Sequence, residues 1–308
     1  MDETQSVLAK LNSSFPRVAS MPPLAARQAV DSRITPSRNL NDVLRSEDMA
    51  FAIPDGTVKV RVYYPHEPAP NAPATVYAHG GGFLHGSIAG HDRFCRIWAA
   101  NTGSTVISVD YRLAPEHSAP TPVFDVAAAA EWACESGYGT NGIVLAGDSA
   151  GANLAAVACI LLRERGSTVV AGQVLLYPML DPTMDTDSYR RCAEGFFITA
   201  EALAFYWRTY LGDSIVAPEA DWRIAPLAAA DHSNLPPSIT VTAGLDPLCE
   251  EGRAYSDVLS RAGNRALHRH YPDQFHGFLT MPDYSPGGSA QHTLWADFRN
   301  FFIKEHNA

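Results

Sequence analysis

Short apolar runs alternate with helix-like segments along most of the chain, and this alternation constrains the fold more than any other feature. Runs rich in β-branched and apolar residues are typical of buried strands, and they occur at 58–63, 74–78, 104–109, 142–146, 174–178 and 238–243. Between and after them, the spacing of apolar residues predicts helices at 93–100, 123–134, 152–163, 253–261 and 293–303. Parallel strands need crossover connections, usually helices. The order therefore predicts an α/β fold with a mostly parallel sheet flanked by helices.

Two stretches of the chain depart from this alternation. Residues 1–50 contain short helix-like pieces interrupted by Pro22, Pro23 and Pro36, so we expect loosely attached helices and no strand there. A second helix-rich stretch interrupts the strand series between Tyr177 and Ser238, with a helix expected over 200–211. The length of 308 residues suits one large domain over 51–308 that carries this insertion.

The charge of the chain excludes some classes of partner. The formal net charge is -10 at pH 7, with 33 acidic against 23 basic side chains. Nucleic acids and anionic membranes attract clustered Lys and Arg. We therefore predict neither nucleic acid nor a membrane as a partner.

The cysteines and the N-terminal residues bear on the compartment. Five scattered cysteines without a CxxC pair argue against a disulfide framework or a zinc site, and they favour a reducing compartment; they are Cys95, Cys134, Cys159, Cys192 and Cys249. The N-terminus lacks a basic region followed by an apolar run, so no signal peptide is visible. We expect a cytoplasmic protein.

The sequence Gly147-Asp148-Ser149-Ala150-Gly151 fits the pattern G-x-S-x-G and lies between a predicted strand and a predicted helix. This setting is typical of a nucleophile elbow, a strained turn that exposes a serine hydroxyl. Small neighbours let such a turn pack without clashes, and the following helix directs its N-terminus at the site. A passive serine in a glycine-rich turn is the alternative.

A second glycine motif, His79-Gly80-Gly81-Gly82, follows the strand predicted at 74–78. Adjacent glycines allow backbone N–H groups to approach a substrate oxygen, as acyl transfer requires. A phosphate-binding P-loop is excluded because no Gly-Lys-Ser/Thr follows. The two motifs in one chain indicate the α/β-hydrolase fold, in which an acid and then a histidine follow the serine.

That chain order restricts the candidates for the base and the acid. A further short strand is predicted at 268–271. His276 lies in the Phe275-His276-Gly277-Phe278 loop after it, whereas His268 and His270 alternate along that strand and His292 and His306 belong to the terminal helix. Asp246 lies on the loop after the strand at 238–243. A carboxylate on that loop can accept a hydrogen bond from the histidine ring and so keep the ring in one tautomer. We therefore predict Ser149, His276 and Asp246 as the catalytic residues. Glu250 and Glu251 are rival acids, although they fit the first turn of the next helix better.

Motifs spread over nearly the whole chain resemble those of the bacterial hormone-sensitive-lipase-like carboxylesterases, in the branch marked by GDSAG. Besides the two glycine motifs, the resemblance rests on segments 109–117, 195–199, 246–252 and 275–278. It implies oxyanion donors at the amides of Gly81, Gly82 and Ala150. It also implies a helical cap built from residues 1–50 and about 183–218, with the catalytic domain in 51–308. Cys249 stands where the family usually has Arg, and Ala152 where it commonly has Gly.

The resemblance implies a serine esterase for small-molecule esters of short to medium acyl chains, often a homodimer, without metal or organic cofactor. Specificity is expected to come from the cap, and five aromatic residues could line an apolar acyl pocket: Phe83, Phe196, Phe197, Tyr206 and Trp207. For Tyr206 and Trp207, packing of the cap helix is the alternative. An arylformamidase or amidase, or a lactonase, would use the same residues. A non-catalytic hormone receptor is disfavoured because the catalytic histidine is present, and a lipase for long-chain emulsions because no secretion signal is visible.

Overall fold

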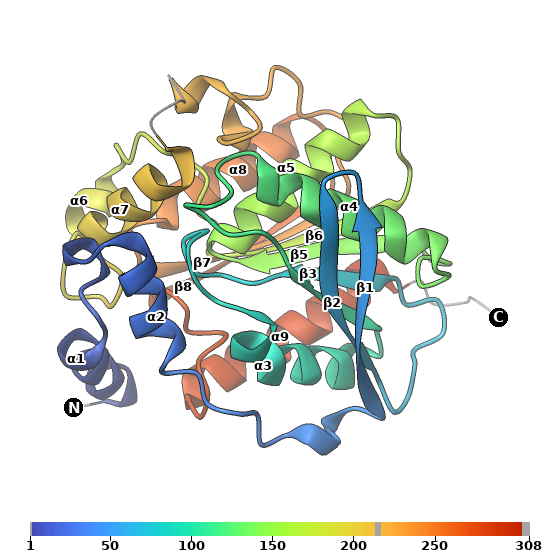
Figure 1. Cartoon of the computed structure of the whole chain (residues 1–308), viewed down its shortest axis with the longest axis horizontal. Coiled ribbons are helices and arrows are strands. Elements are labelled where there is room, and N and C mark those ends of the chain that lie inside the picture. Colours follow the sequence, from blue (N-terminus) through green and yellow to red (C-terminus); the bar gives the residue numbers. More distant parts are fainter. Residues whose placement is uncertain (1, 213–216, 304–308) are drawn as a thin grey trace.

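The computed structural model describes residues 2–212 and 217–303, which form an eight-stranded sheet flanked by helices (Figure 1). The strand order is β1-β2-β4-β3-β5-β6-β7-β8. Strand β2 runs antiparallel to β1 and β4, and the pairs from β4 to β8 are parallel. The predicted α/β fold with a mostly parallel sheet is therefore confirmed. The strands are β1 (Arg45–Ile53), β2 (Gly56–Tyr64), β3 (Ala74–Ala78), β4 (Val106–Asp110), β5 (Ile143–Asp148), β6 (Val170–Leu176), β7 (Ser238–Leu245) and β8 (Ala266–Phe275).

Helices cover both faces of the sheet, and alternate residues of each strand face opposite layers. Val76 and Leu145 pack in the core beneath α4 (Thr121–Glu135), α5 (Ala150–Glu164) and α8 (Cys249–Arg261). Their neighbours Tyr77 and Ala146 pack in the core beneath α3 (Ile88–Thr102) and α9 (Ser285–Phe302). Both faces of the strands are thus buried, which explains why these strands read as continuous apolar runs. Among the residues described, no helix combines the length and apolar character needed to cross a bilayer.

Strand β1 is missing from the sequence-based expectations and begins inside the segment expected to be helical. It pairs with β2 over its whole length, from Arg45 opposite Tyr64 to Ile53 opposite Gly56. Most of its residues are exposed because it lies at the edge of the sheet, so its sequence shows no apolar alternation. The expectation of no strand before residue 50 is therefore wrong.

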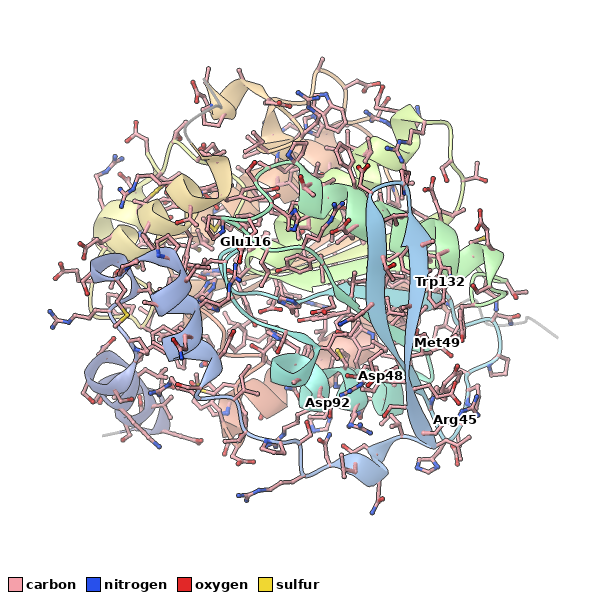
Figure 2. All side chains as sticks on the ribbon, in the orientation of Figure 1. Arg45, Asp48, Met49, Asp92, Glu116 and Trp132 are labelled. Carbon is pink, nitrogen blue, oxygen red and sulfur yellow. The ribbon has the colours of Figure 1, made fainter. Side chains whose placement is uncertain are left out.

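The N-terminal helices are more firmly attached than predicted. They are α1 (Glu3–Ser14), α2 (Pro23–Asp31) and the short 3₁₀ turns η1 (Val18–Ser20) and η2 (Leu40–Asp42). Val18 and Ala26 are buried, and the Arg27 guanidinium on α2 donates to the carbonyls of Leu84 (2.7 Å) and Ala114 (2.6 Å). The same guanidinium pairs with Glu116, labelled in Figure 2. These contacts correct the expectation of loose attachment.

The N-terminal helices lie on the same side of the molecule as α6 (Asp187–Arg191) and α7 (Ala200–Leu211) (Figure 1). Asn12 on α1 bonds to the backbone of the loop between these two helices, at Gly195 and Phe197. The helix expected at 200–211 matches α7. Residues 213–216 of the expected insertion lie outside the described residues. The short turns η3 (Pro218–Ala220) and η4 (Pro226–Ala228) follow.

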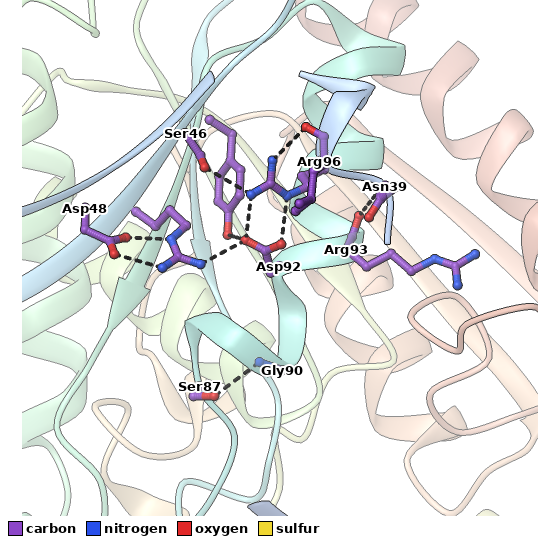
Figure 3. A network of polar contacts seen from close by, with 11 residues as sticks. Asn39, Ser46, Asp48, Ser87, Gly90, Asp92, Arg93 and Arg96 are labelled. Atoms are coloured by element: carbon purple, nitrogen blue, oxygen red, sulfur yellow. Dashed lines mark hydrogen bonds and ion pairs between the residues drawn. The ribbon is translucent and has the colours of Figure 1, made fainter. Parts of the chain in front are cut away.

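A polar network ties α3 to the antiparallel edge of the sheet (Figure 3). The Asp92 carboxylate on α3 accepts hydrogen bonds from the Tyr63 hydroxyl (2.9 Å) and the Arg61 guanidinium (3.0 Å) of β2, and from Arg96 (2.7 Å). Arg61 also pairs with Asp48 of β1. These partners hold Asp92, which directly follows His91 in α3.

Candidate active site

Ser149 occupies a strained turn between β5 and α5. Its backbone has φ 55° and ψ -118°, in the left-handed region that costs energy for a residue other than glycine. The N–H of Ser149 donates to the Leu176 carbonyl (2.9 Å), which helps to hold the turn. A Cβ on Gly151 would lie 2.0 Å from the Ala78 carbonyl oxygen. The glycine of the motif is therefore needed for close packing of the turn against β3.

The structure brings Ser149, His276 and Asp246 together from three separate loops. The Nε2 atom of His276 lies 3.0 Å from Ser149 Oγ, and its Nδ1 lies 2.8 Å from Asp246 Oδ2. The other carboxylate oxygen of Asp246 accepts from the Leu248 N–H (2.9 Å). All three side chains are buried. This arrangement allows Nδ1–H to donate to Asp246 while Nε2 accepts the serine proton.

The rival candidates lie elsewhere. His268 and His270 on β8 both contact Thr242 Oγ1, at 2.8 and 3.0 Å. Glu250 and Glu251 lie in the first turn of α8, and Glu251 accepts from the Leu180 N–H (2.7 Å). His292 lies on α9, and His306 is outside the described residues.

The glycines proposed as oxyanion donors line the same cavity as Ser149. Gly81 and Gly82 have φ 128° and 58°, and a Cβ on Gly82 would lie 2.2 Å from the Tyr206 ring. Ala150 is the first residue of α5, where a helix leaves its N–H groups without intrahelical acceptors. Within the described part of the chain, these three amides donate to no other protein group. They are therefore free to donate to a substrate oxygen.

A buried cluster that the sequence analysis missed joins the elbow to the glycine loop. The Asp148 carboxylate accepts from the Tyr77 hydroxyl (2.6 Å) and the Gly80 N–H (2.8 Å), and His91 Nε2 lies 3.2 Å away. Burial alone would lower the pKa of His91, but the Asp148 carboxylate outweighs burial and holds that pKa above its ordinary value of 6.5. Burial would raise the pKa of Asp148, yet His91 and the donated hydrogen bonds hold it below 3.8. Asp148 stands inside a recognised motif, but nothing in the sequence marks His91 as its partner.

The opposed pKa shifts predict a pH window for stability. A raised histidine pKa stabilises the fold below about pH 6.5, and this contribution is lost as pH rises through the native pKa of His91. A lowered aspartate pKa stabilises it above about pH 3.8, and this contribution is lost as pH falls through the native pKa of Asp148. His91→Gln should therefore reduce the free energy of unfolding most between these values. Urea unfolding of both proteins from pH 4 to pH 9 measures this, and a difference that is independent of pH would contradict it.

The cavity at Ser149 has a volume of about 240 Å³ and includes residues from the N-terminal helices and from the loop before α7. Two of the predicted pocket residues, Phe197 and Tyr206, line it. The Tyr206 hydroxyl also contacts His85 Nε2 (2.8 Å), and burial lowers the pKa of His85 to about 3, so this histidine is neutral. The N-terminal contributors Phe15, Val30 and Ile34 were not predicted, because their sequence contains no motif.

The other predicted pocket residues pack instead of facing this cavity. Phe83 is fully buried and stacks on Tyr210, with ring centroids 3.8 Å apart. Trp207 is buried beside Phe83 at 5.5 Å, and Phe196 packs against the core beneath α9. None of these three residues is among the described residues that line the cavity. Their expected contact with substrate is therefore corrected to a packing role.

Cys249, the departure from the family motif, opens α8 three residues after Asp246. Burial raises the pKa of its thiol to about 11, so the thiol stays protonated near neutral pH. Its sulfur lies 3.8 Å from His270 Nδ1. In the described ranges, no three His, Cys, Asp or Glu side chains gather closely enough to share a metal ion.

Comparisons with known proteins show the family to which the chain belongs. A family model described as the alpha/beta hydrolase fold matches residues 75–280. The carboxylic ester hydrolase LipN of Mycobacterium tuberculosis is 38% identical over 252 residues, which span 79% of this chain and 66% of LipN. The esterase LipI of the same organism is 34% identical over 272 residues, which span 86% of this chain and 84% of LipI.

A solved structure covers more of the chain. The structure of an ester hydrolase from the metagenome of Lake Arreo, in complex with a bipyridine phosphonate derivative, superposes with a TM-score of 0.89 at 34% identity. The match covers 99% of both chains. With its elbow, glycine loop and eight-stranded sheet, the chain belongs to the hormone-sensitive-lipase-like group of the α/β-hydrolase family.

Proposed function

We propose that this protein is a serine carboxylesterase that hydrolyses esters of short to medium acyl chains through an acyl-enzyme intermediate. The observation that carries the proposal is the continuous hydrogen-bonded chain from Asp246 through His276 to Ser149, at 2.8 and 3.0 Å. Its position in a cavity beside Gly81 and Gly82 adds donors for the reacting carbonyl. The names of LipN and LipI as ester hydrolases support the same reaction class.

The proposed reaction uses the chain's own residues and water. His276 Nε2 takes the proton of Ser149 Oγ as this oxygen attacks the ester carbonyl carbon. The amides of Gly81, Gly82 and Ala150 stabilise the negative charge on the carbonyl oxygen. The tetrahedral intermediate collapses, and the alcohol leaves with the proton held on Nε2. Water then attacks the acyl-enzyme by the same route, releasing the acid and Ser149.

The buried Asp246 carboxylate supports both half-reactions. It keeps the proton of neutral His276 on Nδ1, which leaves Nε2 free to act as the base. It also stabilises the imidazolium that forms when Nε2 is protonated. A non-catalytic receptor would not need Ser149, His276 and Asp246 to lie within hydrogen-bond distance of one another.

The size of the cavity supports small substrates. Its volume of about 240 Å³ lies below the roughly 300–1,000 Å³ of sites for drug-sized ligands. Five cysteines, each an unpaired thiol, support a reducing compartment such as the cytoplasm. The family resemblance supports a homodimer, which sedimentation of the purified protein would test.

A panel of substrates tests the proposed reaction. We expect the kcat/KM for p-nitrophenyl butyrate to exceed that for an aryl formamide or a lactone by about tenfold or more, because recognition is tuned to an ester. Within an acyl series from acetate to decanoate, we expect the maximum at short chains. Spontaneous hydrolysis in buffer is the control. A formamide or lactone turned over faster than every ester would replace the proposed function by an amidase or lactonase.

A further inference from the structure

The cavity at Ser149 shares part of its wall with a second, larger cavity. This second cavity has a volume of about 470 Å³ and lies between residues 11–20 and residues 194–202. Phe15, Phe197 and Ile198 line both cavities. These three side chains therefore stand between the catalytic serine and an adjoining space.

Two of these side chains form an aromatic pair across the boundary. The rings of Phe15 and Phe197 meet edge to face, with centroids 5.0 Å apart and planes at 85°, an arrangement that aromatic pairs prefer. Phe197 also reaches the catalytic loop, because a Cβ on Gly277 would lie 3.7 Å from Phe197 Cε1. The pair thus extends from the end of α1 to the residue after His276.

Helix α1 holds Phe197 in place through Asn12. The Asn12 amide donates to the Gly195 carbonyl (2.7 Å), and its carbonyl oxygen accepts from the Phe197 N–H (3.0 Å). The backbone of Phe197 has φ 76°, a conformation that a bulky residue keeps only where its surroundings compensate for the strain. The two bonds from Asn12 supply part of that compensation.

We propose that Phe15 and Phe197 form a partition that limits the length of substrate alkyl chains, and that the second cavity accepts the far end of longer chains only when this partition is opened. The proposal rests on the proposed esterase function. Leu11, Val18 and Ala202 are among the residues that line the second cavity, and their apolar side chains suit methylene groups. Arg17, Glu194 and Glu201 also line it. With the partition in place, an ester is confined to the smaller cavity.

Phe15→Ala tests the partition without touching the catalytic residues. Removing this ring should join the two cavities, and each methylene that becomes buried adds roughly fourfold to binding. We expect the ratio of kcat/KM for p-nitrophenyl octanoate to that for the butyrate to rise about tenfold, which corresponds to the burial of between one and two further methylenes. A parallel series of alkyl butyrates, from ethyl to octyl, shows whether the chain enters from the acyl or the alcohol side.

Phe51→Ala is a matched control. Phe51 is also half-buried and paired with an aromatic ring at 5.0 Å, that of Trp132, but it lies on β1 and lines neither cavity. The Phe51→Ala change should leave the kcat/KM ratio of octanoate to butyrate, and that of octyl to ethyl butyrate, unchanged. Asn12→Ala, which frees Phe197, should change the ratio in the same direction as Phe15→Ala.

A binding measurement separates this proposal from the esterase function. In the Ser149→Ala protein, calorimetry with octanoate and with 1-octanol should show about tenfold tighter binding of at least one of them when Phe15→Ala is added. Butyrate affinity, measured in the same two proteins, is the reference against which the octyl affinities are compared. Unchanged octyl selectivity in both rate and binding, with a normally folded protein, would overturn the partition. If the protein with Ser149 intact hydrolysed no ester, but Phe15→Ala still tightened octyl binding, the esterase proposal alone would be overturned.

Discussion

Replacing Ser149 with alanine is expected to lower kcat for p-nitrophenyl butyrate by about 10⁶-fold. The side chain supplies the atom that attacks the carbonyl, and no other hydroxyl is bonded to His276 Nε2 among the residues described. The residual rate should come from the oxyanion donors and substrate binding alone. Single-turnover and steady-state measurements of nitrophenol release would give this factor.

The fold should survive this change, which makes the loss of activity interpretable. Ser149 already has a strained φ of 55°, and alanine carries the same Cβ into that conformation without new strain. Thermal unfolding and circular dichroism should therefore match those of the unmodified protein. His276→Ala should lower kcat by a similar factor, because residues that act as a unit are not additive. Substantial retained activity in the folded Ser149→Ala protein would disprove the proposed nucleophile.

Asp246→Asn is expected to lower kcat by about 10⁴-fold. An amide can donate a hydrogen bond to Nδ1, which favours the tautomer with its proton on Nε2. That tautomer cannot accept the proton of Ser149. The distance of 2.8 Å between Asp246 Oδ2 and Nδ1 makes this effect direct. The pH dependence of kcat should show the remaining activity rising toward alkaline pH, as hydroxide deprotonates the serine.

Glu250→Gln provides the matched control for the acid. Glu250 stands four residues after Asp246, but its carboxylate accepts from the Ser188 N–H (3.1 Å) rather than from His276. The same loss of one negative charge should therefore leave kcat within a few-fold of the original value. If Glu250→Gln proves the more damaging change, the choice of Asp246 is wrong.

Much of the fold was predictable because strands buried on both faces leave a strong local signal. The run predicted at 74–78 coincides with β3, and the helix predicted at 200–211 coincides with α7. Strand β1 left no such signal, because an edge strand with exposed side chains can carry polar residues such as Glu47 and Asp48. Its existence depends on pairing with β2, which is a long-range property.

The candidate site also contains residues that the sequence predicted correctly and residues that it did not. Ser149, Asp246 and His276 were chosen from motifs and chain order, and the structure places them within hydrogen-bond distance. Phe83 was expected to line the pocket, and Trp207 either to line it or to pack the cap helix; both pack internally. Aromatic character alone does not indicate which way a side chain points.

The sequence by itself determined the parallel α/β sheet, the elbow at Ser149 and the order of the acid and the histidine, because these features depend on local spacing and on glycines that admit no side chain. Only the tertiary structure decided the shape of the catalytic cavity. Phe15 and Phe197 are 182 residues apart in the chain, and their rings meet at 5.0 Å because α1 packs beside the loop before α7. His91 reaches Asp148 in the same way, through the packing of α3 on the sheet. Contacts of this kind depend on how the elements pack, and packing leaves no periodic pattern in the sequence.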